Sequence, residues 1–453
     1  MAGTDFLRAP TAEERRRAGK ARRSECPRSA HAGWTPPADR PDPIAILEEQ
    51  GRSRIRELLP IRHGRMVESP FACFRGAAAI MAHDLASTPT SGIEVQACGD
   101  AHLLNFGVWA TPERHLVFEV NDFDETLPAP FDWDVKRLAA SVFVAGRDNG
   151  FADRDCALAA RAGVAEYRER MTTLAGSNQL DRWYDRIDID QVLAVVRPAQ
   201  RDQAERVVRK ARRRTNLATL DKLTTVADGG RRFVDDPPLI ERLIAEEYVF
   251  RVRAAYREYV RSLPEDRRVL LRRFEFVDAA RKVVGVGSVG TDTRVVLLRG
   301  SGEGDPLFLQ IKEAQPSVLE PHCRPCAYRH QGRRVVCGQR LMQAASDIFL
   351  GWMRSDDRHY YVRQLRDMKG SVEIERLSAE GLAGYARLCG AELARAHARG
   401  GDADAIAGYL GRNDRFDRAV GEFAAAYANQ TEKDHDALAS AVKSGRVEAV
   451  EGV

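Results

Sequence analysis

The sequence predicts an α+β fold with two lobes, in which a small β-rich lobe lies between two helical regions. Around Phe274 the pattern changes from helical spacing to short β-branched runs separated by Gly and Asp turns. After Gly370 the helical spacing returns, over 384–399 and 416–428. Before Phe274, apolar residues recur at the three- and four-residue steps of one helix face over 46–59, 71–85, 134–175 and 235–262.

The β-rich region is expected to hold one helix, from about Val335 to Trp352, among several short strands. The expected strands are Phe274–Val277, Val283–Val286, Arg294–Leu298, Leu307–Ile311 and a pair around Tyr360–Leu365. The predicted units are a flexible basic and Pro-rich tail over 1–45, a helical lobe over 46–270, a β-rich lobe over 271–374, and helices over 375–453 that complete the helical lobe.

The composition excludes several classes of protein. The 453 residues are 44% hydrophobic and 30% charged, which fits a globular protein with a large core. The 70 basic and 66 acidic side chains leave a net charge of +4, too little for a protein that mainly coats nucleic acid. No apolar run approaches the ~18 residues of a membrane span, and Met1–Ser24 lacks the apolar stretch of a secretory signal. The eight cysteines are too dilute for a disulfide scaffold, so we expect a cytoplasmic location.

Two basic segments leave alternatives open. Residues 1–45 contain arginines and then prolines with little periodic hydrophobicity, so we expect a solvated arm rather than one that binds nucleic acid. Arg197–Arg214 is strongly basic and is expected to be the exposed face of a helix. Contact with RNA or phosphate is the less favoured interpretation of this stretch.

The first chemical motif follows the short extended segment Ile93–Val95. Asp100 and Asn105 are separated by four residues, which is the spacing of a kinase catalytic loop. In that loop the Asp receives or orients the proton of the acceptor hydroxyl, and the Asn oxygen holds a metal ion. Taken singly the spacing is a weak signal, because Asp and Asn are common in turns.

A second acidic motif, Asn121-Asp122-Phe123-Asp124-Glu125, follows the predicted strand Leu116–Val120. A hairpin therefore connects it to the first motif, as in kinases, where the catalytic loop leads to a metal-binding Asp-Phe-Gly. The alternative is an acidic turn that only fixes the hairpin. Carboxylate and amide oxygens suit Mg²⁺, so we expect Asn105 and Asp122 to hold a metal ion and Asp124 to be a candidate ligand of a second one.

A glycine loop and a lysine complete the pattern. Gly285, Gly287, Ser288 and Gly290 belong to a G-x-G-x-x-G that is followed by a β-branched strand and not by the helix of a dinucleotide fold. Strand, glycine loop and strand is the kinase arrangement, in which backbone N–H groups cover the nucleotide phosphates.

The next predicted strand ends in Lys312, which we expect to bind the phosphates of ATP. A helix glutamate holds the corresponding lysine of kinases. Glu320 is the candidate here, and Glu313 is a weaker one.

The order of these motifs is unusual for a kinase. The acidic motifs at 98–125 precede the glycine loop at 285–290, whereas a kinase has the reverse order. This order predicts a circularly permuted, two-lobed protein-kinase-like fold. Chain ends usually lie at the surface and often close together, so such a permutation is compatible with folding.

The chain resembles the bacterial domain-of-unknown-function family 2252. The segment around Asp100 is also similar to the aminoglycoside-phosphotransferase branch of kinase-like proteins, with Cys98 in place of the usual His. The resemblance to family 2252 covers nearly everything after residue 50, and the family name implies no activity. It rests on Arg65-Met66, Ser69–Phe71, Phe74–Gly76, Cys98–Gly107, Asn121–Thr126, Trp133–Ala139, Val284–Thr291, Gly338–Asp347 and Arg363–Gly370.

Several other residues have ordinary explanations. Cys323 and Cys326 form a single C-x-x-C, and structural zinc needs four ligands, which only Cys337 and His330 could complete. His397 lies on an apolar helix and is expected to be a buried, hydrogen-bonded histidine. Three basic residues, Arg65, Arg75 and Lys136, could meet an anionic substrate, although ion pairing within the protein is the better interpretation.

The sequence therefore predicts an ATP- and Mg²⁺-dependent phosphotransferase with an unidentified acceptor. Asp100 would orient or deprotonate the acceptor, and Lys312 with the glycine loop would hold the phosphates. One alternative is a non-catalytic nucleotide-binding regulator of the same fold, and a second is a nucleotidyltransferase. The least favoured is a protein associated with nucleic acid through Arg197–Arg214.

Overall fold

The computed structural model shows a mixed α+β protein. It describes residues 9–196, 198–227, 230–243, 245–283, 285–365 and 368–452. Residues 1–8 of the predicted tail, Arg197 of the predicted basic stretch and Val284 of the predicted strand Val283–Val286 lie outside these ranges.

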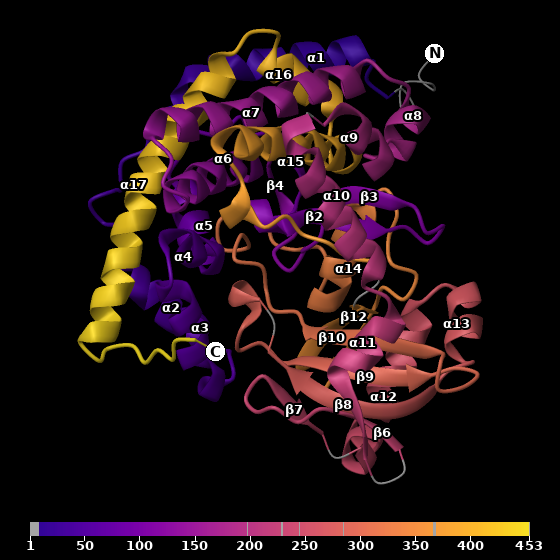
Figure 1. Ribbon diagram of the computed structural model, residues 1–453. Helices are drawn as coiled ribbons and strands as arrows, with labels where there is room; N and C mark the ends of the chain where they lie inside the picture. The colour runs from indigo at the N-terminus through magenta and orange to yellow at the C-terminus, as the bar shows by residue number, and fades with distance from the viewer. Residues whose placement is uncertain are drawn as a thin grey trace.

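The largest sheet among the described residues has six strands (Figure 1). They are β7 (Ile240–Arg242), β8 (Glu275–Lys282), β9 (Thr293–Arg299), β10 (Pro306–Glu313), β11 (Gly351–Ser355) and β12 (Arg358–Gln364). Their spatial order is β11-β12-β10-β9-β8-β7, and every neighbouring pair is antiparallel. β10 lies near the middle of the sheet and is buried along its whole length. Lys312 lies near the end of this strand and is therefore held by a rigid element.

Two predicted elements of this lobe differ from the structure. The strand predicted over Val283–Val286 is not found at the described residues of that range, because β8 ends at Lys282 and a 3-10 turn occupies Val286–Ser288. The helix predicted from about Val335 to Trp352 is α14 (Gln331–Met342), and β11 begins at Gly351. Asp347 lies in the connection between α14 and β11, and its carboxylate fixes this connection by accepting the N–H groups of Phe349 and Gln364.

Two antiparallel strand pairs carry the predicted acidic motifs. β1 (Glu94–Ala97) pairs with β4 (Leu127–Pro130), and β2 (Phe106–Ala110) pairs with β3 (Leu116–Val120). The 98–105 loop connects β1 to β2, and the 121–126 loop connects β3 to β4. Figure 1 shows these strands between the helices and the large sheet.

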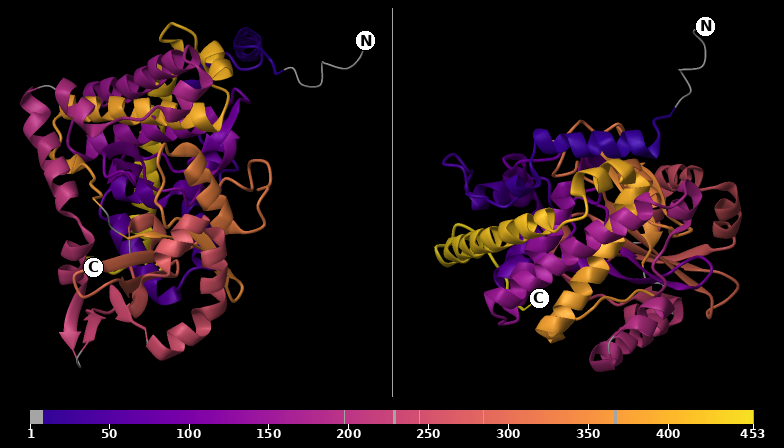
Figure 2. Two further views of the ribbon diagram at one scale, coloured as in Figure 1. Left: turned by 90° about the vertical axis from the view of Figure 1, so that its right-hand side faces the viewer. Right: turned by 90° about the horizontal axis from the view of Figure 1, so that it is seen from above.

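The helices gather mostly on one side of the large sheet, as the left view of Figure 2 shows. They are α1 (Ala12–Ala21), α2 (Pro43–Gly51), α3 (Leu59–Val67), α4 (Pro70–Gly76), α5 (Ala78–Ala86), α6 (Phe131–Asp148), α7 (Asp153–Ala175), α8 (Gln179–Tyr184), α9 (Ile189–Val195), α10 (Pro198–Arg213), α15 (Ala379–Gly400), α16 (Ala403–Leu410) and α17 (Arg415–Lys443). None of the helices in the described ranges combines the length and apolar character needed to cross a membrane.

Helices from the two ends of the chain pack against each other. α15 lies along α7. A Cβ atom on Gly390 would stand 2.1 Å from the carbonyl oxygen of Gly163, so glycine at this position lets the two backbones approach closely. α17 packs along α6 and α7, and the helices after Gly370 thus share one core with those that precede the large sheet.

The small lobe begins earlier than the expected boundary at residue 271. α12 (Ala245–Ser262) and α13 (Glu265–Leu271) belong with the sheet, because the Tyr259 hydroxyl donates to the Phe349 carbonyl and Leu271 is buried in the same core. On the other face, α11 (Asn216–Leu223) packs with the hairpin of β5 (Thr224–Ala227) and β6 (Gly230–Phe233).

The segment 9–45, for which the sequence predicts a tail, is packed onto the helical lobe. α1 lies against α16, where a Cβ atom on Gly19 would stand 1.8 Å from the carbonyl oxygen of Ala405. Arg23 donates to the carbonyl oxygens of Gly408 and Tyr409. Arg23 and Gly19 thus contact a helix that is distant in the sequence. Such contacts do not produce the periodic apolar pattern by which a packed helix is recognised in a sequence.

Arg40 holds the end of this segment in place. Its guanidinium donates to both carboxylate oxygens of Asp84 at 2.7 and 2.8 Å and to both of Asp434 at 2.8 and 2.7 Å. The three side chains are 8%, 2% and 9% exposed. One buried cation therefore compensates two buried anions from α5 and α17.

Replacing this cation tests whether the segment is part of the fold. Arg40→Met would leave two buried carboxylates without a counter-charge, and we expect the free energy of unfolding to fall by about 3–5 kcal/mol. The matched control is Arg446→Met, because Arg446 pairs with Asp42 and Glu48 but is 44% exposed. Its loss should be far smaller than that of Arg40→Met, because exposed ion pairs contribute little to stability. Urea denaturation of both variants measures the difference, and equal losses would contradict the assignment.

Candidate functional site

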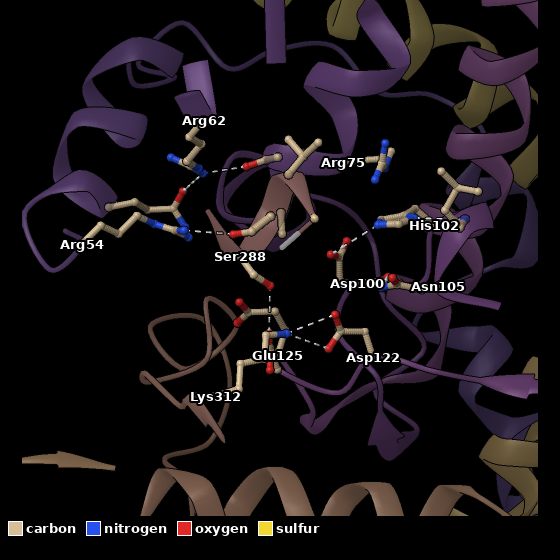
Figure 3. A pocket seen from close by; sticks show the side chains of 18 of the residues that line it. Arg54, Arg62, Arg75, Asp100, His102, Asn105, Asp122, Glu125, Ser288 and Lys312 are labelled. Carbon is tan, nitrogen blue, oxygen red and sulfur yellow. Dashed lines mark hydrogen bonds and ion pairs between the residues drawn. The ribbon is translucent and has the colours of Figure 1, made fainter. Parts of the chain in front are cut away.

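One cavity of about 250 Å³ lies between the two lobes (Figure 3). Most of the residues singled out from the sequence line it, although they come from segments far apart in the chain. From the helical lobe these are Asp100, Asn105, Asp122 and Asp124, and from the small lobe Gly285, Gly287, Ser288 and Lys312. Two others, Gly290 and Glu320, are not among the lining residues.

A buried carboxylate at the start of α6 fixes the 98–105 loop. Asp134 accepts the N–H of Cys98 at 2.8 Å and the N–H of Gly99 at 3.0 Å. The Asp134 carboxylate lies 3.1 Å from Nε2 of His397, and the Tyr167 hydroxyl lies 2.9 Å from Nδ1 of the same ring. If Nε2 donates to the carboxylate, Nδ1 accepts from Tyr167, so both ring nitrogens are satisfied. His397 is thus the buried, hydrogen-bonded residue that the sequence predicts.

Gly99 brings the two acidic loops into contact. Its φ of +81° is a left-handed conformation, and a Cβ atom there would lie 2.4 Å from the carbonyl oxygen of Glu125. Glycine is needed here for both the conformation and the space. Asn121 adds a second contact by donating its N–H to the Asn105 carbonyl at 2.8 Å. The loops that carry Asp100 and Asp122 therefore have a fixed separation.

Asp100 points into the cavity with a cation behind it. Arg137, from α6, donates through Nε to Oδ1 of Asp100 at 2.5 Å, and its Nη2 donates to the Phe74 carbonyl. Burial raises the pKa of Asp100 above its usual value, and the charge of Arg137 acts in the opposite direction. His102 lies 3.7 Å from Oδ2, and burial lowers its pKa well below the usual value, so its ring is neutral.

Asn105 has one amide atom committed and one available. Its nitrogen donates to the carbonyl oxygen of Asp100 at 2.6 Å. Only the amide nitrogen can donate, so the side-chain oxygen is the atom left for a cation. This arrangement suits the ligand role expected from the sequence.

Lys312 joins the two lobes through an ion pair. Its Nζ lies 3.4 Å from both carboxylate oxygens of Asp122 and also donates to Asp124, whose other oxygen accepts from the Tyr361 hydroxyl at 2.7 Å. The side chain of Lys312 is 2% exposed. Burial alone would lower the pKa of Lys312, but the two aspartates outweigh it and raise that pKa. Burial likewise opposes the charge of Asp122, but Lys312 and Arg363 lower its pKa.

The glycine loop connects β8 to β9 and is held by the segment before α3. Arg54 donates to the carbonyl oxygens of Gly287 at 3.0 Å and Val289 at 2.5 Å, and the Ile55 N–H donates to the Gly290 carbonyl. Of the three glycines, Gly290 has the left-handed φ of +91°, and its Cβ would crowd Arg54. Gly285 and Gly287 have room for a Cβ atom. They line the cavity with Ser288, whose hydroxyl lies 3.5 Å from Asp124.

Glu320 does not hold Lys312. Its carboxylate accepts the Cys326 N–H at 3.2 Å, and the carboxylates bonded to Lys312 are those of the acidic loop. Glu313 instead bonds Arg358 and the Asp292 N–H. The helix after β10, α14, presents Arg334 to this region, and its guanidinium donates to the carbonyl oxygens of Asp124, Thr126 and Gln315. The helix that follows β10 therefore contributes Arg334, which holds the acidic loop, and not a glutamate that holds Lys312.

Several cavity residues have no signal of their own in the sequence. They are Arg54 and Arg62, from the segments around α3, Glu125 of the acidic loop, and Gln310 and Arg363 of the sheet. Arg363 donates to the Gln310 side chain and to the Asn121 carbonyl. The alternation of β10 and β12 could have placed Gln310, Lys312 and Arg363 on one face, but it could not say which face meets the acidic loop.

The remaining candidates do not form a second site in the described part of the chain. No three His, Cys, Asp or Glu side chains there are grouped to hold a metal ion, and Cys323 and Cys326 are free thiols. The magnesium set expected from the sequence has two carboxylates and one amide oxygen. Along α10, basic side chains pair with acids: Arg201 and Arg209 with Glu205, and Lys210 with Glu373. These pairs favour the solvated-helix interpretation of the basic stretch.

Glu125 makes the stability of the folded protein depend on pH. Burial raises the pKa of Glu125 to about 7, above the usual 4.5, so the folded state binds its proton more tightly than the unfolded state. Its contribution to stability is therefore complete below pH 4.5 and is lost as the pH rises through about 7. We expect Glu125→Gln, which cannot ionise, to lack this loss of about 3 kcal/mol between pH 4.5 and 8.

Urea denaturation at pH 5 and pH 8 measures this effect. The wild type should lose more stability than Glu125→Gln on going to pH 8, and the exposed Glu375→Gln should behave as the wild type. Parallel pH profiles for the wild type and Glu125→Gln would contradict the assignment.

Comparisons with known proteins give a family and no closer relative. No curated protein and no solved structure matches the chain. A family model does match, over residues 54–441, and its description is "Uncharacterized protein conserved in bacteria (DUF2252)". That match includes both acidic loops, the glycine loop and Lys312. The chain therefore belongs to the bacterial family DUF2252.

Proposed function

We propose that this protein is an ATP- and Mg²⁺-dependent phosphotransferase with a circularly permuted, two-lobed kinase-like fold. One observation carries the proposal: the acids of the 98–105 and 121–126 loops face Lys312 and the glycine loop across a single cavity. Phosphoryl transfer depends mainly on positioning and on stabilisation of charge, and this cavity offers groups of both signs on rigid elements.

The donor set fits a magnesium ion. Asp122 and Asp124 supply carboxylates on one loop, and Asn105 has its side-chain oxygen available beside them. Mg²⁺ usually takes one or two carboxylates and completes its shell with water and substrate phosphates. The two aspartates already share one buried cation, Lys312, which marks a place where positive charge is stable. A bound Mg²⁺ would neutralise charge on the phosphate oxygens.

Lys312 and the glycine loop would bind the phosphates of ATP. Lys312 keeps its proton at neutral pH, because the aspartates raise its pKa. Gly285, Gly287 and Ser288 of the glycine loop line the same cavity. The cavity of about 250 Å³ is smaller than the ~300–1,000 Å³ of most ligand pockets, so it suits the phosphate part of a nucleotide better than a whole one.

Asp100 would act on the acceptor hydroxyl. It faces the same cavity as Asp122, and the amide of Asn105 holds its backbone. Burial raises the pKa of Asp100, which makes its carboxylate a stronger base than an exposed aspartate. Arg137 fixes one of its oxygens, so the other is the one available to the acceptor.

A non-catalytic nucleotide-binding regulator is the second candidate. The ion pair between Asp100 and Arg137 favours it, because an arginine partner weakens a carboxylate as a base. Transfer of a nucleotidyl rather than a phosphoryl group would use the same residues. All three candidate functions bind a nucleotide, so they are distinguished by which group, if any, the protein transfers.

Removal of Asp122 tests the metal and nucleotide site. We expect Asp122→Ala to abolish Mg²⁺-dependent binding of ATP, because it removes one of two metal carboxylates and half of the counter-charge of Lys312. Calorimetric titration of ATP with and without Mg²⁺ measures this. The exposed Asp357→Ala is the control and should bind as the wild type. Binding by Asp122→Ala at wild-type strength would remove this residue from the site.

Isotope labelling separates transfer from binding alone. The wild type should release or transfer label from γ-labelled ATP, and Asp100→Asn should lower that rate by about 10²-fold or more while ATP still binds. Label that moves from α-labelled ATP would indicate nucleotidyl transfer. A wild type that binds Mg²⁺ and ATP but moves neither label would support the regulator. Thermal unfolding of Asp100→Asn checks that Arg137 without its partner does not unfold the protein.

A further inference from the structure

Three arginines of the helical lobe line the cavity without an acidic partner. Arg54 precedes the 3-10 turn Arg56–Leu58, Arg62 lies on α3, and Arg75 lies on α4. In Figure 3 they stand along the wall that faces Asp100 and Ser288. Among the described residues, no carboxylate lies within ion-pair distance of any of the three. Of the other two cations that line this cavity, Lys312 pairs with the aspartates of the acidic loop. Arg363 donates to the Gln310 side chain and to the Asn121 carbonyl.

Arg62 is the most deeply buried of them. It is 0% exposed, and its Nη2 donates to the Gly76 carbonyl at 2.9 Å and to Gln50 at 3.1 Å. Its Nε and Nη1 have no hydrogen-bond partner among the described residues. Burial lowers the pKa of Arg62 well below its usual value, and the nearby charge of Arg54 lowers it further. Buried arginines are ordinarily paired, so these free N–H groups indicate a missing anion.

Arg75 adds a second free guanidinium on the side of the cavity that holds Asp100. It has no hydrogen bond or ion pair in the described part of the chain, and its buried Nε is unsatisfied. Burial lowers its pKa, and the charge of Asp100 is the largest influence in the other direction. Arg75 thus lies near the residue that would act on the acceptor. Arg54 instead faces the charges of Glu125 and Asp124 and holds the glycine loop.

We infer that Arg62 and Arg75, with Arg54 beside them, form a second anion subsite that takes a phosphate group carried by the acceptor. This inference rests on the proposed function, because it assigns the acceptor to the Asp100 side of the cavity. The acceptor would be a small phosphorylated hydroxyl compound. Its phosphate would bind the arginines, and its hydroxyl would face Asp100.

The chemistry of the wall favours phosphate over other anions. Guanidinium groups bind phosphate oxygens through two parallel N–H donors, and several of them can share one tetrahedral anion. Three such groups around one cavity provide more donors than a single planar carboxylate can accept. The same wall would repel a polycationic acceptor, because its like charges are uncompensated.

The nucleotide's own phosphates have other partners available. Lys312 and the glycine loop lie beside Asp122 and Asp124, where the metal would bind. The backbone of Arg75 lies beside Gly287, but its guanidinium stands on the Asp100 and His102 side of the cavity in Figure 3. Two anion sites in one cavity, one on each side of the transferred group, are what transfer to a phosphorylated acceptor requires.

Titration of the full-length protein with inorganic phosphate tests the subsite. The first titration uses protein free of nucleotide and metal, and the second uses protein saturated with Mg²⁺ and a non-hydrolysable ATP analogue. Arg62→Gln and Arg75→Gln should each weaken phosphate binding by about tenfold or more. Arg75→Lys should restore part of the loss. The control is Arg56→Gln, which removes an exposed charge from the same segment and should change binding less than about twofold.

The inference holds if phosphate binds in both titrations and depends on Arg75. It is overturned if wild-type protein binds no phosphate, if Arg75→Gln binds as the wild type, or if acetate binds as tightly as phosphate. It is also overturned if the ATP analogue displaces phosphate and Arg75→Gln weakens both ligands equally, because the arginines would then serve the nucleotide. Failure of the ATP analogue to bind, with phosphate binding still dependent on Arg75, would contradict the proposed function and support the anion subsite.

Discussion

The buried ion pair between Lys312 and the aspartates of the 121–126 loop is the constraint on which the cavity depends. Lys312 belongs to a central strand of the sheet, and its counter-charges belong to a loop of the helical lobe. A buried ammonium without a partner is costly, so the two lobes are held in the one register that brings these groups together. Arg334 and Arg363 strengthen this register, because both donate from the small lobe to carbonyl oxygens of the same acidic loop.

The acidic loops are rigid for reasons that lie deeper in the helical lobe. Asp134 holds two N–H groups of the 98–105 loop, and its own carboxylate is held by His397 of α15. Gly99 then allows the two loops to touch. The positions of Asp100 and Asp122 are therefore set by helices from both ends of the chain. Groups that must meet a substrate within a few tenths of an ångström need this kind of support.

Much of the site could be predicted from the sequence because its signals are local. Asp100, Asn105, Asp122 and Lys312 are each recognised by spacing and by the strand beside them, and all four line one cavity. The strands around the glycine loop also follow local β-branched patterns, apart from Val283–Val286, where Gly285 and Gly287 belong to a turn.

The failures come from interactions between distant segments. The candidates Glu320 and Glu313 both lie within eight residues of Lys312 in the sequence. The observed partners of Lys312 come from 188 and 190 residues away. The arginines of α3 and α4 look like ordinary surface charges until the fold turns them into the cavity. The segment 9–45 similarly has no apolar period, because it is held by Arg23 and Arg40 through carbonyl and carboxylate contacts on other helices.

The cavity has two walls, one formed by the large sheet and one by the helical lobe. Its shape depends on how these walls are built and less on the order of the motifs in the chain. The sheet carries Lys312 and the glycine loop whether it precedes or follows the acidic loops, because β8, β9 and β10 are joined by short local turns. The helical lobe is likewise complete only when α15 and α17 pack against α6 and α7. Where the two walls meet, Arg54 of the helical lobe holds the glycine loop of the sheet through two carbonyl oxygens. The circularly permuted, kinase-like fold proposed above would therefore depend on these contacts and on the ion pair of Lys312, rather than on the order of the motifs in the chain.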